Sequence, residues 1–394
     1  MKIEPSLSYR GSELYLLGHR LSGVANDYGT PTYVYCFERV RQKLKILRQS
    51  FSQDLHIHYS MKANSHRGLL KKLRREGVGV DVVSGGEIQR AFECGFRGKD
   101  IIFSGVGKSV DEIELSLKRQ IHIFNIESPQ ELERIGQLAK KLKRTAQVSF
   151  RLNPDVNPVT HPYITTGFRN NKFGMDRSFV PALLKILKKY PHSLNLVGLD
   201  FHIGSQLFEI GPFEDAAKKA LPLFNNLRAQ GFPLKYFDIG GGIGVPYENR
   251  QSLDLALYGK KIEKLLTGMD ATLLCEPGRF LVADAGVLLT KVEYIKKTPS
   301  KNFVIVDTGM HHLLRPALYQ AFHKILPVSK KRRLSLKTDV VGPICESSDW
   351  LAQNRKMQKM EQDEILAICD TGAYGYVMCS DYNLHEKPTE VLLD

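Results

Sequence analysis

The feature that most constrains the fold is a regular alternation of short apolar runs with longer amphipathic segments. Between the runs, segments such as "HRGLLKKLRRE" and "SPQELERIGQLAKKLK" have the spacing of apolar residues typical of helices. Eight runs with strand character follow one another along the chain: "HIHYSM" (56–61), "GVDVV" (79–83), "DIIFS" (100–104), "HIFNI" (122–126), "AQVSFRL" (146–152), "LNLVGLDFH" (194–202), "KYFDI" (235–239) and "ATLLCE" (271–276). Eight strands that alternate with helices predict a closed parallel (β/α)8 barrel, with "FERVRQKLKILRQSF" as the helix before the first strand.

The pattern changes near residue 283. Runs such as "GVLLTKVEYIKKT", "NFVIVDTG" and "EILAICDTGAYG" are strand-like, and most of them have no long helix between them. This pattern predicts a second, mostly antiparallel β domain. The early runs "ELYLLG" and "PTYVYCF" are expected in that domain or at the junction. We therefore expect a barrel at 27–282 and a β domain formed by 1–26 with 283–394.

Composition limits the classes of protein that this chain can belong to. Its 394 residues suffice for a barrel and a smaller domain. No apolar run is long enough to span a bilayer, and "MKIEPSLSYRGSELYL" lacks the apolar core of a secretory signal. The six cysteines include no CxxC pair, which argues against a zinc site and a disulfide framework. We expect a cytoplasmic protein without a membrane partner and without a bound metal.

The net charge of +14 raises the question of nucleic-acid binding. Most of the positive charge is spread over helical segments such as "KKLRRE", and the one dense group, "KKRR" at 330–333, is expected in a loop. No interleaving of aromatic and basic residues of the kind that binds single strands is present. We expect no nucleic-acid partner, although a weak surface preference for polyanions is compatible with the charge.

Polar residues gather where the predicted barrel strands end, which is where barrels of this type carry their chemistry. The strand ends bring together Lys62, Asp81, Ser84, Asn125, Arg151, His202, the "DIGGGIG" turn at 238–244 and "EPGR" at 276–279. Barrels often bind phosphate in the loops after strands seven and eight. Glycines let backbone N–H groups approach an anion closely, although tight turns explain most glycine runs. The "GGGIGVPY" turn leads into a proline, so it is not a dinucleotide-binding fingerprint.

A lysine in a barrel mouth can form an imine with an aldehyde, and pyridoxal 5'-phosphate is a phosphorylated aldehyde. Glu276 would then keep the pyridine nitrogen protonated, and His202 would stack on the ring. Each residue alone has an ordinary explanation: a surface lysine, a structural histidine, an ion pair between Glu276 and Arg279, or a turn capped by Asp81. Their joint position at ordered strand ends favours the cofactor site.

Longer motifs support this interpretation. They include "YSMKANS", "VDVVSGGE", "RLNPDVNPVTHPYITTGFRNNKFGM", "FHIGSQ", "DIGGGIGVPY", "CEPGRFLVADAGVLLTKV", "DTGMHHLLRPALYQAFH", "VVGPICESSDWLA" and "DTGAYGYVMCSDYN". In their order and content they resemble the diaminopimelate decarboxylases, pyridoxal-phosphate enzymes of the alanine-racemase and ornithine-decarboxylase fold group. The resemblance runs from about residue 27 to the end. The family's usual "YAVKAN" is "YSMKAN" here, a change we expect to be tolerated.

The resemblance implies a homodimer with active sites at the interface, and it implies roles for individual residues. Lys62 would bind the cofactor covalently, Glu276 would contact its pyridine nitrogen, and Cys345 would donate a proton across the dimer. The remaining cofactor contacts implied are Asp81, His202, Ser205, Gly241, Gly242, Gly278, Arg279 and Tyr374, and the substrate contacts are Arg279, Arg315, Tyr319, Glu346 and Tyr374. Glu346 would receive the distal ammonium of the substrate.

The "CES" motif with "RPALY" favours a substrate that carries an amine and a carboxylate at both ends, because ornithine decarboxylases have an aspartate after the cysteine. The expected reaction is decarboxylation of meso-2,6-diaminopimelate to L-lysine and carbon dioxide, the last step of lysine biosynthesis. Alternatives are a decarboxylase for ornithine, lysine or a carrier-tethered amino acid, and a binding protein without activity.

Cys345 alone could be a small buried apolar residue. Family members commonly continue beyond "PTEVLLD" with a charged stretch, and we expect function to survive without it if it is a surface tail.

Overall fold

The computed structural model describes residues 6–156, 172–248 and 251–394. Residues 157–171, within one of the family-like motifs, therefore lie outside the described part. The chain forms two compact units: Met1–Lys43, Val245–Arg250 and Arg279–Asp394 make the β unit, and Leu44–Gly244 with Gln251–Gly278 make the barrel unit. This division differs from the boundaries expected from the sequence at 27–43, because β4 (Thr32–Cys36) pairs with strands of the β unit.

The barrel unit contains the predicted closed ring of eight parallel strands. Its strands are β5 (Leu55–Ser60), β6 (Gly79–Val82), β7 (Ile101–Phe103), β8 (Ile123–Ile126), β9 (Ala146–Leu152), β10 (Leu194–Phe201), β11 (Tyr236–Asp238) and β12 (Thr272–Cys275). They pair in sequence order, and β12 closes the ring on β5. The strands are buried along most of their length, as expected for a parallel sheet covered on its outer face.

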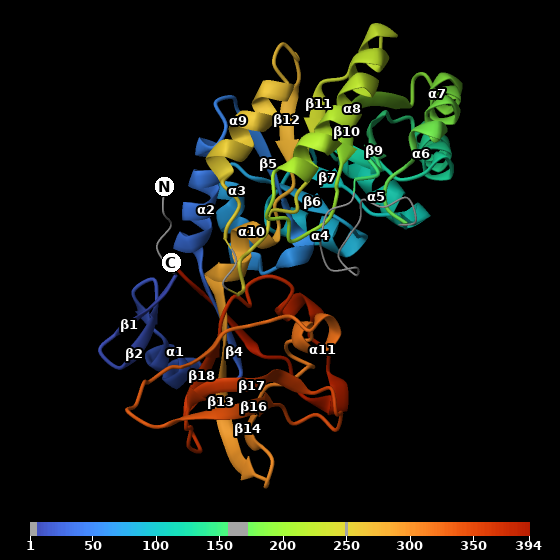
Figure 1. Cartoon of the computed structure of the whole chain (residues 1–394). Helices are drawn as coiled ribbons and strands as arrows, with labels where there is room; N and C mark the ends of the chain where they lie inside the picture. Colours follow the sequence, from blue (N-terminus) through green and yellow to red (C-terminus); the bar gives the residue numbers. More distant parts are fainter. Residues whose placement is uncertain (1–5, 157–171, 249–250) are drawn as a thin grey trace. The chain divides into compact units, whose positions relative to one another are not determined.

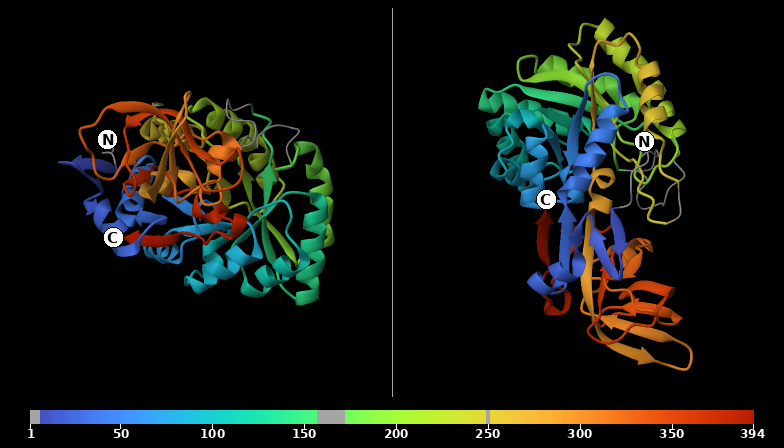
Figure 2. Two further views of the ribbon diagram at one scale, coloured as in Figure 1. Left: turned by 90° about the horizontal axis from the view of Figure 1, so that it is seen from below. Right: turned by 90° about the vertical axis from the view of Figure 1, so that its left-hand side faces the viewer.

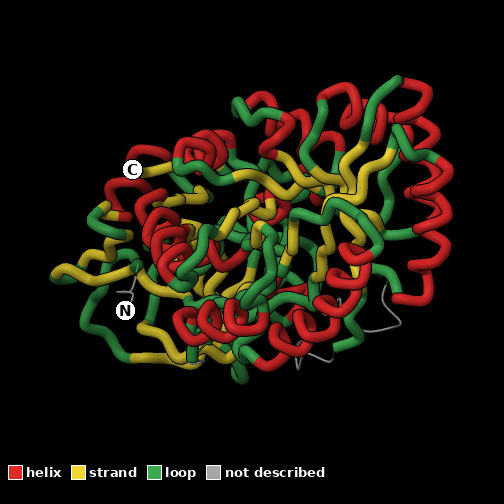
Figure 3. The backbone as a smooth tube through the Cα atoms, turned by 90° about the horizontal axis from the view of Figure 1, so that it is seen from above, coloured by secondary structure: helices red, strands yellow, loops and turns green. Residues whose placement is uncertain are grey.

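Helices surround the barrel strands (Figures 1 and 3). They are α3 (Arg67–Arg75), α4 (Gly85–Glu93), α5 (Val110–Arg119), α6 (Pro129–Leu142), α7 (Val180–Lys189), α8 (Gly211–Ala229) and α9 (Leu255–Leu265), preceded by α2 (Phe37–Gln49), which crosses the division between the units. The predicted caps are present: Ser109 forms a capping box with Glu112, and Ser128 caps α6 before Pro129. No helix among the described residues is long and apolar enough to cross a membrane.

The β unit is built from a mixed, mostly antiparallel sheet and a small three-stranded sheet. Its elements are β1 (Leu7–Arg10), β2 (Glu13–Leu16), β3 (His19–Arg20), α1 (Leu21–Tyr28), β4, α10 (Arg279–Val282), β13 (Gly286–Lys297), β14 (Asn302–Val306), α11 (Arg315–Tyr319), β15 (Ile325–Pro327), β16 (Ser335–Val341), β17 (Trp350–Gln358), β18 (Ile365–Ile368) and β19 (Thr389–Leu393). The strand order is β15-β18-β13-β14-β16-β17, and β4 joins through β13. The last strand, β19, lies parallel beside β4 (Figure 2). The predicted second, mostly antiparallel β domain is confirmed, and β4, which the expected boundaries placed with the barrel, belongs to it.

Strand β13 organises the core of the β unit, because both faces of its first half are buried. Leu288 and Val292 belong to one apolar cluster, and Val287 and Leu289 belong to another on the opposite face. This alternation is the two-residue period of a strand. The second cluster also takes up apolar side chains from β2 and α1, so the small N-terminal sheet is held to the larger one.

A buried histidine, His58, and a half-buried one, His122, lie at the end of the barrel where the strands begin. His58 on β5 stacks on His122 with ring centroids 6.3 Å apart, and His122 meets Tyr236 edge-on. Nδ1 of His58 is buried and has no hydrogen-bond partner in the described part of the chain. Burial, and next the neighbouring His122, lower the pKa of His58 to about 3. The folded barrel therefore keeps this ring neutral where an unfolded chain would protonate it.

This arrangement predicts acid-linked loss of stability. Below pH 6.5 the unfolded state binds a proton at His58 that the folded state does not bind, so the free energy of unfolding decreases as the pH falls from about 6.5 towards 3. We expect His58→Leu to make the decrease shallower by up to about 1.4 kcal/mol per pH unit. Urea unfolding between pH 5 and pH 7.5 measures this slope. The exposed His192→Leu is the control, and a wild-type slope in His58→Leu would contradict the assignment.

Candidate active site

Lys62 lies in a short 3-10 turn, Met61–Ala63, directly after β5. Its Nζ is 3.3 Å from Oδ2 of Asp81, which is fully buried on β6. The Ser60 hydroxyl donates to the same carboxylate oxygen at 2.9 Å and also contacts the backbone carbonyl of Glu276. The neighbouring strand ends thus hold a lysine amine and a carboxylate against each other, as the order of the strands predicted.

The glycine turn after β11 is packed tightly between the ends of β10 and β12. A Cβ on Gly241 would lie 2.2 Å from the carbonyl oxygen of Glu276, and one on Gly242 would lie 2.5 Å from that of Gly204. Gly242 also has a φ of +105°, which favours glycine. The N–H of Leu207 donates to the carbonyl of Gly242. The loop that carries Ser205 therefore lies beside the glycine turn, which brings these predicted phosphate contacts together.

The end of β12 adjoins the Lys62 segment. A Cβ on Gly278 would lie 3.1 Å from Cβ of Ser60 and 3.2 Å from Cβ of Ala63. The N–H of Ser60 also donates to the carbonyl of Pro277. The predicted residues Lys62, Asp81, Gly241, Glu276 and Gly278 therefore form one continuous set of contacts at the carboxyl ends of the barrel strands.

Glu276 is buried, and the amide of Asn125 donates to its Oε1 at 3.2 Å. Burial raises the pKa of Glu276 well above its usual range, and the negative charges of Asp81 and Asp238 add to the effect. The carboxyl group is therefore kept protonated when it faces no additional positive charge. A protonated ring nitrogen beside Glu276 would add a positive charge and reduce the repulsion among these carboxylates. Glu276 is therefore suited to bind such a nitrogen.

His202 lies at the end of β10 and contacts the glycine turn. Its Nδ1 accepts the N–H of Gly241 at 3.1 Å, so the proton of the neutral ring is on Nε2. Burial, followed by the positive charges of Arg151 and Lys62, lowers the pKa of His202 well below its ordinary value. A neutral, flat ring held in this way is suited to stack on an aromatic cofactor.

Two carboxylates without a role predicted from the sequence, Asp200 and Asp238, lie beside Glu276. Side-chain oxygens of Asp200, Asp238 and Glu276 lie within 4.8 Å of one another, a spacing compatible with a cation. Arg151 lies 3.7 Å from Asp200 and also pairs with Glu127. Burial raises the pKa of Asp200 to about 7 and also raises the pKa of Asp238. The group of carboxylates therefore carries less negative charge than full ionisation would give it. Their positions at the ends of β10 and β11 are the signal that could have identified them.

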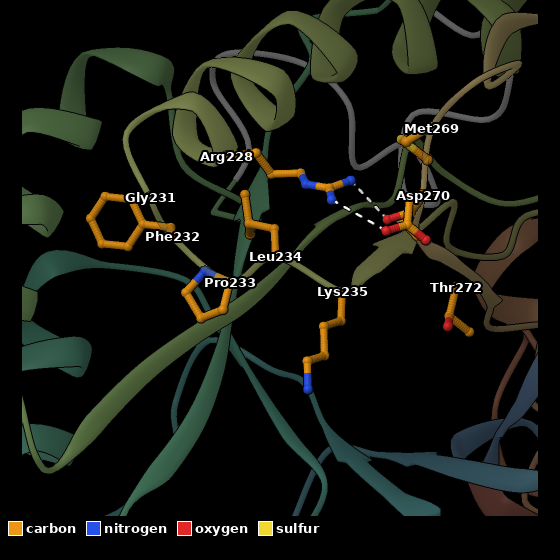
Figure 4. Close-up of a pocket in the computed structure, with 10 residues that line it drawn as sticks. Arg228, Gly231, Phe232, Pro233, Leu234, Lys235, Met269, Asp270 and Thr272 are labelled. Atoms are coloured by element: carbon orange, nitrogen blue, oxygen red, sulfur yellow. Dashed lines mark hydrogen bonds and ion pairs between the residues drawn. The ribbon is translucent and has the colours of Figure 1, made fainter.

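A separate hollow of about 680 Å³ lies at the opposite end of the barrel, where β11 and β12 begin (Figure 4). Arg228 and Asp270 form an ion pair across it. None of the predicted site residues lines it. This is the end of a barrel at which sequence features usually serve stability rather than chemistry.

Within the β unit, two predicted substrate-binding arginines share a group of aromatic side chains. Arg279 donates to the hydroxyl of Tyr247 at 3.1 Å, and its guanidinium is 4.7 Å from the centre of the Tyr374 ring. Arg315 lies 4.5 Å from the centre of the Tyr247 ring and donates to His323 at 2.8 Å. Tyr374 has a φ of +55°, a conformation that is strained for a residue with a side chain.

Arg315 is only 5% exposed, and it forms no ion pair with a described residue. Its Nε is also buried without a hydrogen-bond partner. Burial lowers the pKa of Arg315, and the nearby Arg279 acts in the same direction. Tyr319 lies close enough to affect both arginines electrostatically. A buried cation without a carboxylate partner is suited to bind an anionic group of a ligand.

The segment with Cys345 and Glu346 is exposed, so the alternative in which Cys345 is a buried apolar residue is wrong. Two residues without an assigned role in the sequence analysis hold this segment. Tyr382 donates to a carboxylate oxygen of Glu346 at 2.6 Å, and the side chain of Asn383 accepts the N–H of Cys345 at 3.3 Å. Both lie in the quoted motif "DTGAYGYVMCSDYN", but only the fold shows what they contact.

The close packing at Gly241 predicts that Gly241→Ala destabilises the barrel unit. The new Cβ would meet backbone atoms, which cannot move as a side chain can, so we expect a loss of about 1–3 kcal/mol in the free energy of unfolding. Gly107→Ala is the matched control, since a Cβ there meets nothing within 4 Å. Chemical denaturation measures both variants, and equal stability of the two would contradict the packing argument.

Comparison with known proteins places this geometry in a family. Residues 37–283 match the model of the pyridoxal-dependent decarboxylases, pyridoxal binding domain. Diaminopimelate decarboxylase of Aquifex aeolicus is 40% identical over 99% of this chain and 93% of its own length, and that of Pseudomonas aeruginosa is 43% identical over 99% and 94%. The crystal structure of diaminopimelate decarboxylase from Helicobacter pylori with L-lysine has a TM-score of 0.91 at 41% identity, covering 95% of this chain and 94% of that one. The chain belongs to the diaminopimelate decarboxylase family of pyridoxal-dependent decarboxylases.

Proposed function

We propose that this chain catalyses the decarboxylation of meso-2,6-diaminopimelate to L-lysine and carbon dioxide, the last step of lysine biosynthesis. The observation that carries the proposal is the convergence of Lys62, Asp81, Glu276 and the glycine turn at the strand ends of a barrel whose relatives are diaminopimelate decarboxylases over nearly the whole chain. The cofactor is pyridoxal 5'-phosphate, which supplies an electron sink for the bond that loses carbon dioxide.

The residues present fit this cofactor. Lys62 would provide the amine that holds its aldehyde carbon, and Asp81 keeps that amine near the strand end. Glu276 would hold the pyridine nitrogen in its protonated form, and His202 would pack on the ring. The closely packed Gly241, Gly242 and Gly278 would let the backbone approach the phosphate. The resemblance to the family implies Ser205, Arg279 and Tyr374 as further contacts of the cofactor.

The arginines of the β unit account for the substrate's carboxylates. Arg315 is a buried cation whose side chain contacts a histidine and an aromatic ring among the described residues, so a substrate carboxylate would complete its surroundings. Arg279 and Tyr319 contribute beside it, with Tyr374 against the Arg279 guanidinium. Glu346 binds the distal ammonium, and Tyr382 holds its carboxylate in place.

Cys345 donates the proton to the carbon that has lost its carboxylate, and it does so in the active site of a partner subunit. The exposure of Cys345 and Glu346 supports this proposal of a homodimer with shared active sites. Tyr382, which contacts Glu346, is 41% exposed, and the nearby Leu384 is 90% exposed. Exposed side chains of this kind are often covered by an interface. The six free thiols support a cytoplasmic location.

Lys62→Ala tests the role of the amine. Without it, we expect loss of the absorbance of the bound cofactor near the edge of the visible range and a decrease of roughly a thousandfold or more in carbon dioxide release. The assay uses meso-diaminopimelate, with ornithine and lysine as competing substrates for the wild type. The exposed Lys99→Ala is the control. Retained absorbance with turnover in Lys62→Ala would refute the role of Lys62, and faster turnover of ornithine by the wild type would refute the substrate.

Cys345→Ala should slow decarboxylation far more than it weakens cofactor binding, because the thiol acts on the reacting carbon and not on the phosphate. Cys94→Ala makes the same chemical change in a buried thiol at the end of α4 and should leave the rate unchanged. Steady-state kinetics and cofactor titration separate the two effects. An equal loss of rate and of cofactor affinity would contradict proton donation by Cys345.

The shared site is tested by mixing Lys62→Ala with Cys345→Ala after dissociation and reassembly. If each site takes its lysine and its cysteine from different subunits, half of the dimers have one intact site, so about a quarter of the wild-type activity should return. Neither variant alone should recover. No recovery in a mixture that has demonstrably exchanged subunits would show that each site is complete within one chain.

A further inference from the structure

The "KKRR" segment, which the proposed function leaves without a role, lines a groove in the β unit. The groove has a volume of about 670 Å³ and lies where the loop after β15 passes the end of β17 and the turn between β1 and β2. Among the residues that the structure describes, no acidic side chain lines it, and five cationic side chains do: Lys330, Lys331, Arg332, Arg333 and Lys356. This volume is typical of small-molecule sites rather than of extended nucleic-acid surfaces.

The backbone of this loop is fixed from three sides. The N–H of Lys330 donates to the carbonyl of Ser12 at 2.7 Å, and that of Lys331 donates to the side chain of Gln358 at 3.2 Å. The N–H of Lys359 donates to the carbonyl of Leu334 at 2.8 Å. The cationic side chains are therefore presented on a defined scaffold, which lowers the entropic cost of binding a ligand.

Carboxylates neutralise only part of the charge. Glu364 pairs with both Lys331 and Arg333 at 2.8 Å, and Glu361 pairs with Arg333. Lys330, Arg332 and Lys356 form no ion pair with any described residue, and the Lys330 amine lies 4.2 Å from the centre of the Tyr9 ring. Five cations facing two carboxylates leave an excess of about three positive charges around one small groove.

The groove also has an apolar wall. Ile325, Leu326 and Met357 line it beside the cations. Inorganic phosphate would use only the charges, whereas a ligand with a phosphate chain and an organic part would use both surfaces. We propose that this groove is a binding site for a small organic polyphosphate, with its phosphates on Lys330, Arg332 and Lys356 and its organic part on the apolar wall. The site is independent of the decarboxylase site.

Calorimetric titration of the cofactor-loaded protein with ATP and with inorganic tripolyphosphate tests this proposal. We expect both to bind, with ATP several-fold tighter because of the apolar wall, and we expect the affinity of both to fall as salt is raised. In Arg332→Ala/Lys356→Ala the affinity for both should fall by about tenfold or more, because two charge-assisted contacts are lost. Carbon dioxide release should not change, so this result is separate from the test of the proposed function.

Lys296→Ala/Lys297→Ala is the matched control, since it removes the same charge from exposed positions on β13 of the same unit. It should retain wild-type binding. Absence of binding at millimolar ATP and tripolyphosphate would overturn the proposal, as would an equal loss of affinity in the two double variants, which would show a general charge effect. Tripolyphosphate binding as tightly as ATP would remove the organic part from the proposal. Binding of a DNA duplex at this groove without binding of ATP would replace the small ligand with nucleic acid.

Discussion

The structure of the site depends on the approach of the glycine turn to the end of β12. At Gly241 the backbone is so close to the carbonyl of Glu276 that no side chain fits between them. The same turn contacts His202 through a backbone N–H and meets the loop with Ser205 through Gly242. Because the ends of β10, β11 and β12 meet in this way, residues far apart in the sequence are fixed to within a few ångströms of each other. The positions of three expected cofactor contacts, Glu276, His202 and Ser205, therefore follow from this one packing constraint.

That closeness has an electrostatic consequence. Asp81, Asp200, Asp238 and Glu276 are buried near one another, and Lys62 and Arg151 are the cations that act on them. Burial of carboxylates is costly unless their charge is balanced or they take up protons. The raised pKa values of Asp238 and Glu276 indicate that these groups take up protons. A cofactor ring that carries a proton on its nitrogen adds positive charge where the excess of acid lies. Binding of such a ring would thereby reduce the repulsion among these carboxylates.

The sequence predicted the elements whose signal is local. Eight apolar runs, their helices and the caps at Ser109 and Ser128 are written in adjacent residues, and the position of Lys62 at a strand end followed from them. Asp200 and Asp238 were not assigned a role, although they lie at predicted strand ends, because their contact with Glu276 forms only when the barrel closes. The contacts of Tyr382 with Glu346 and of Asn383 with Cys345 were also unpredictable, since they join segments 36 and 38 residues apart. The assignment of β4 to the β unit depends likewise on pairing with β13.

The two units differ in what they contribute to the proposed reaction. The barrel supplies a lysine, a buried acid and a glycine turn, which serve any substrate that reacts on this cofactor. The β unit supplies Arg315, a buried cation without a carboxylate partner among the described residues, and the exposed segment with Cys345 and Glu346. Solved structures that are only 20–22% identical share the fold at a TM-score of 0.85, so the architecture alone does not select a substrate. In the proposed function, selection would depend on charges of the β unit, because a second carboxylate and a second ammonium are what distinguish the proposed substrate from simpler diamino acids.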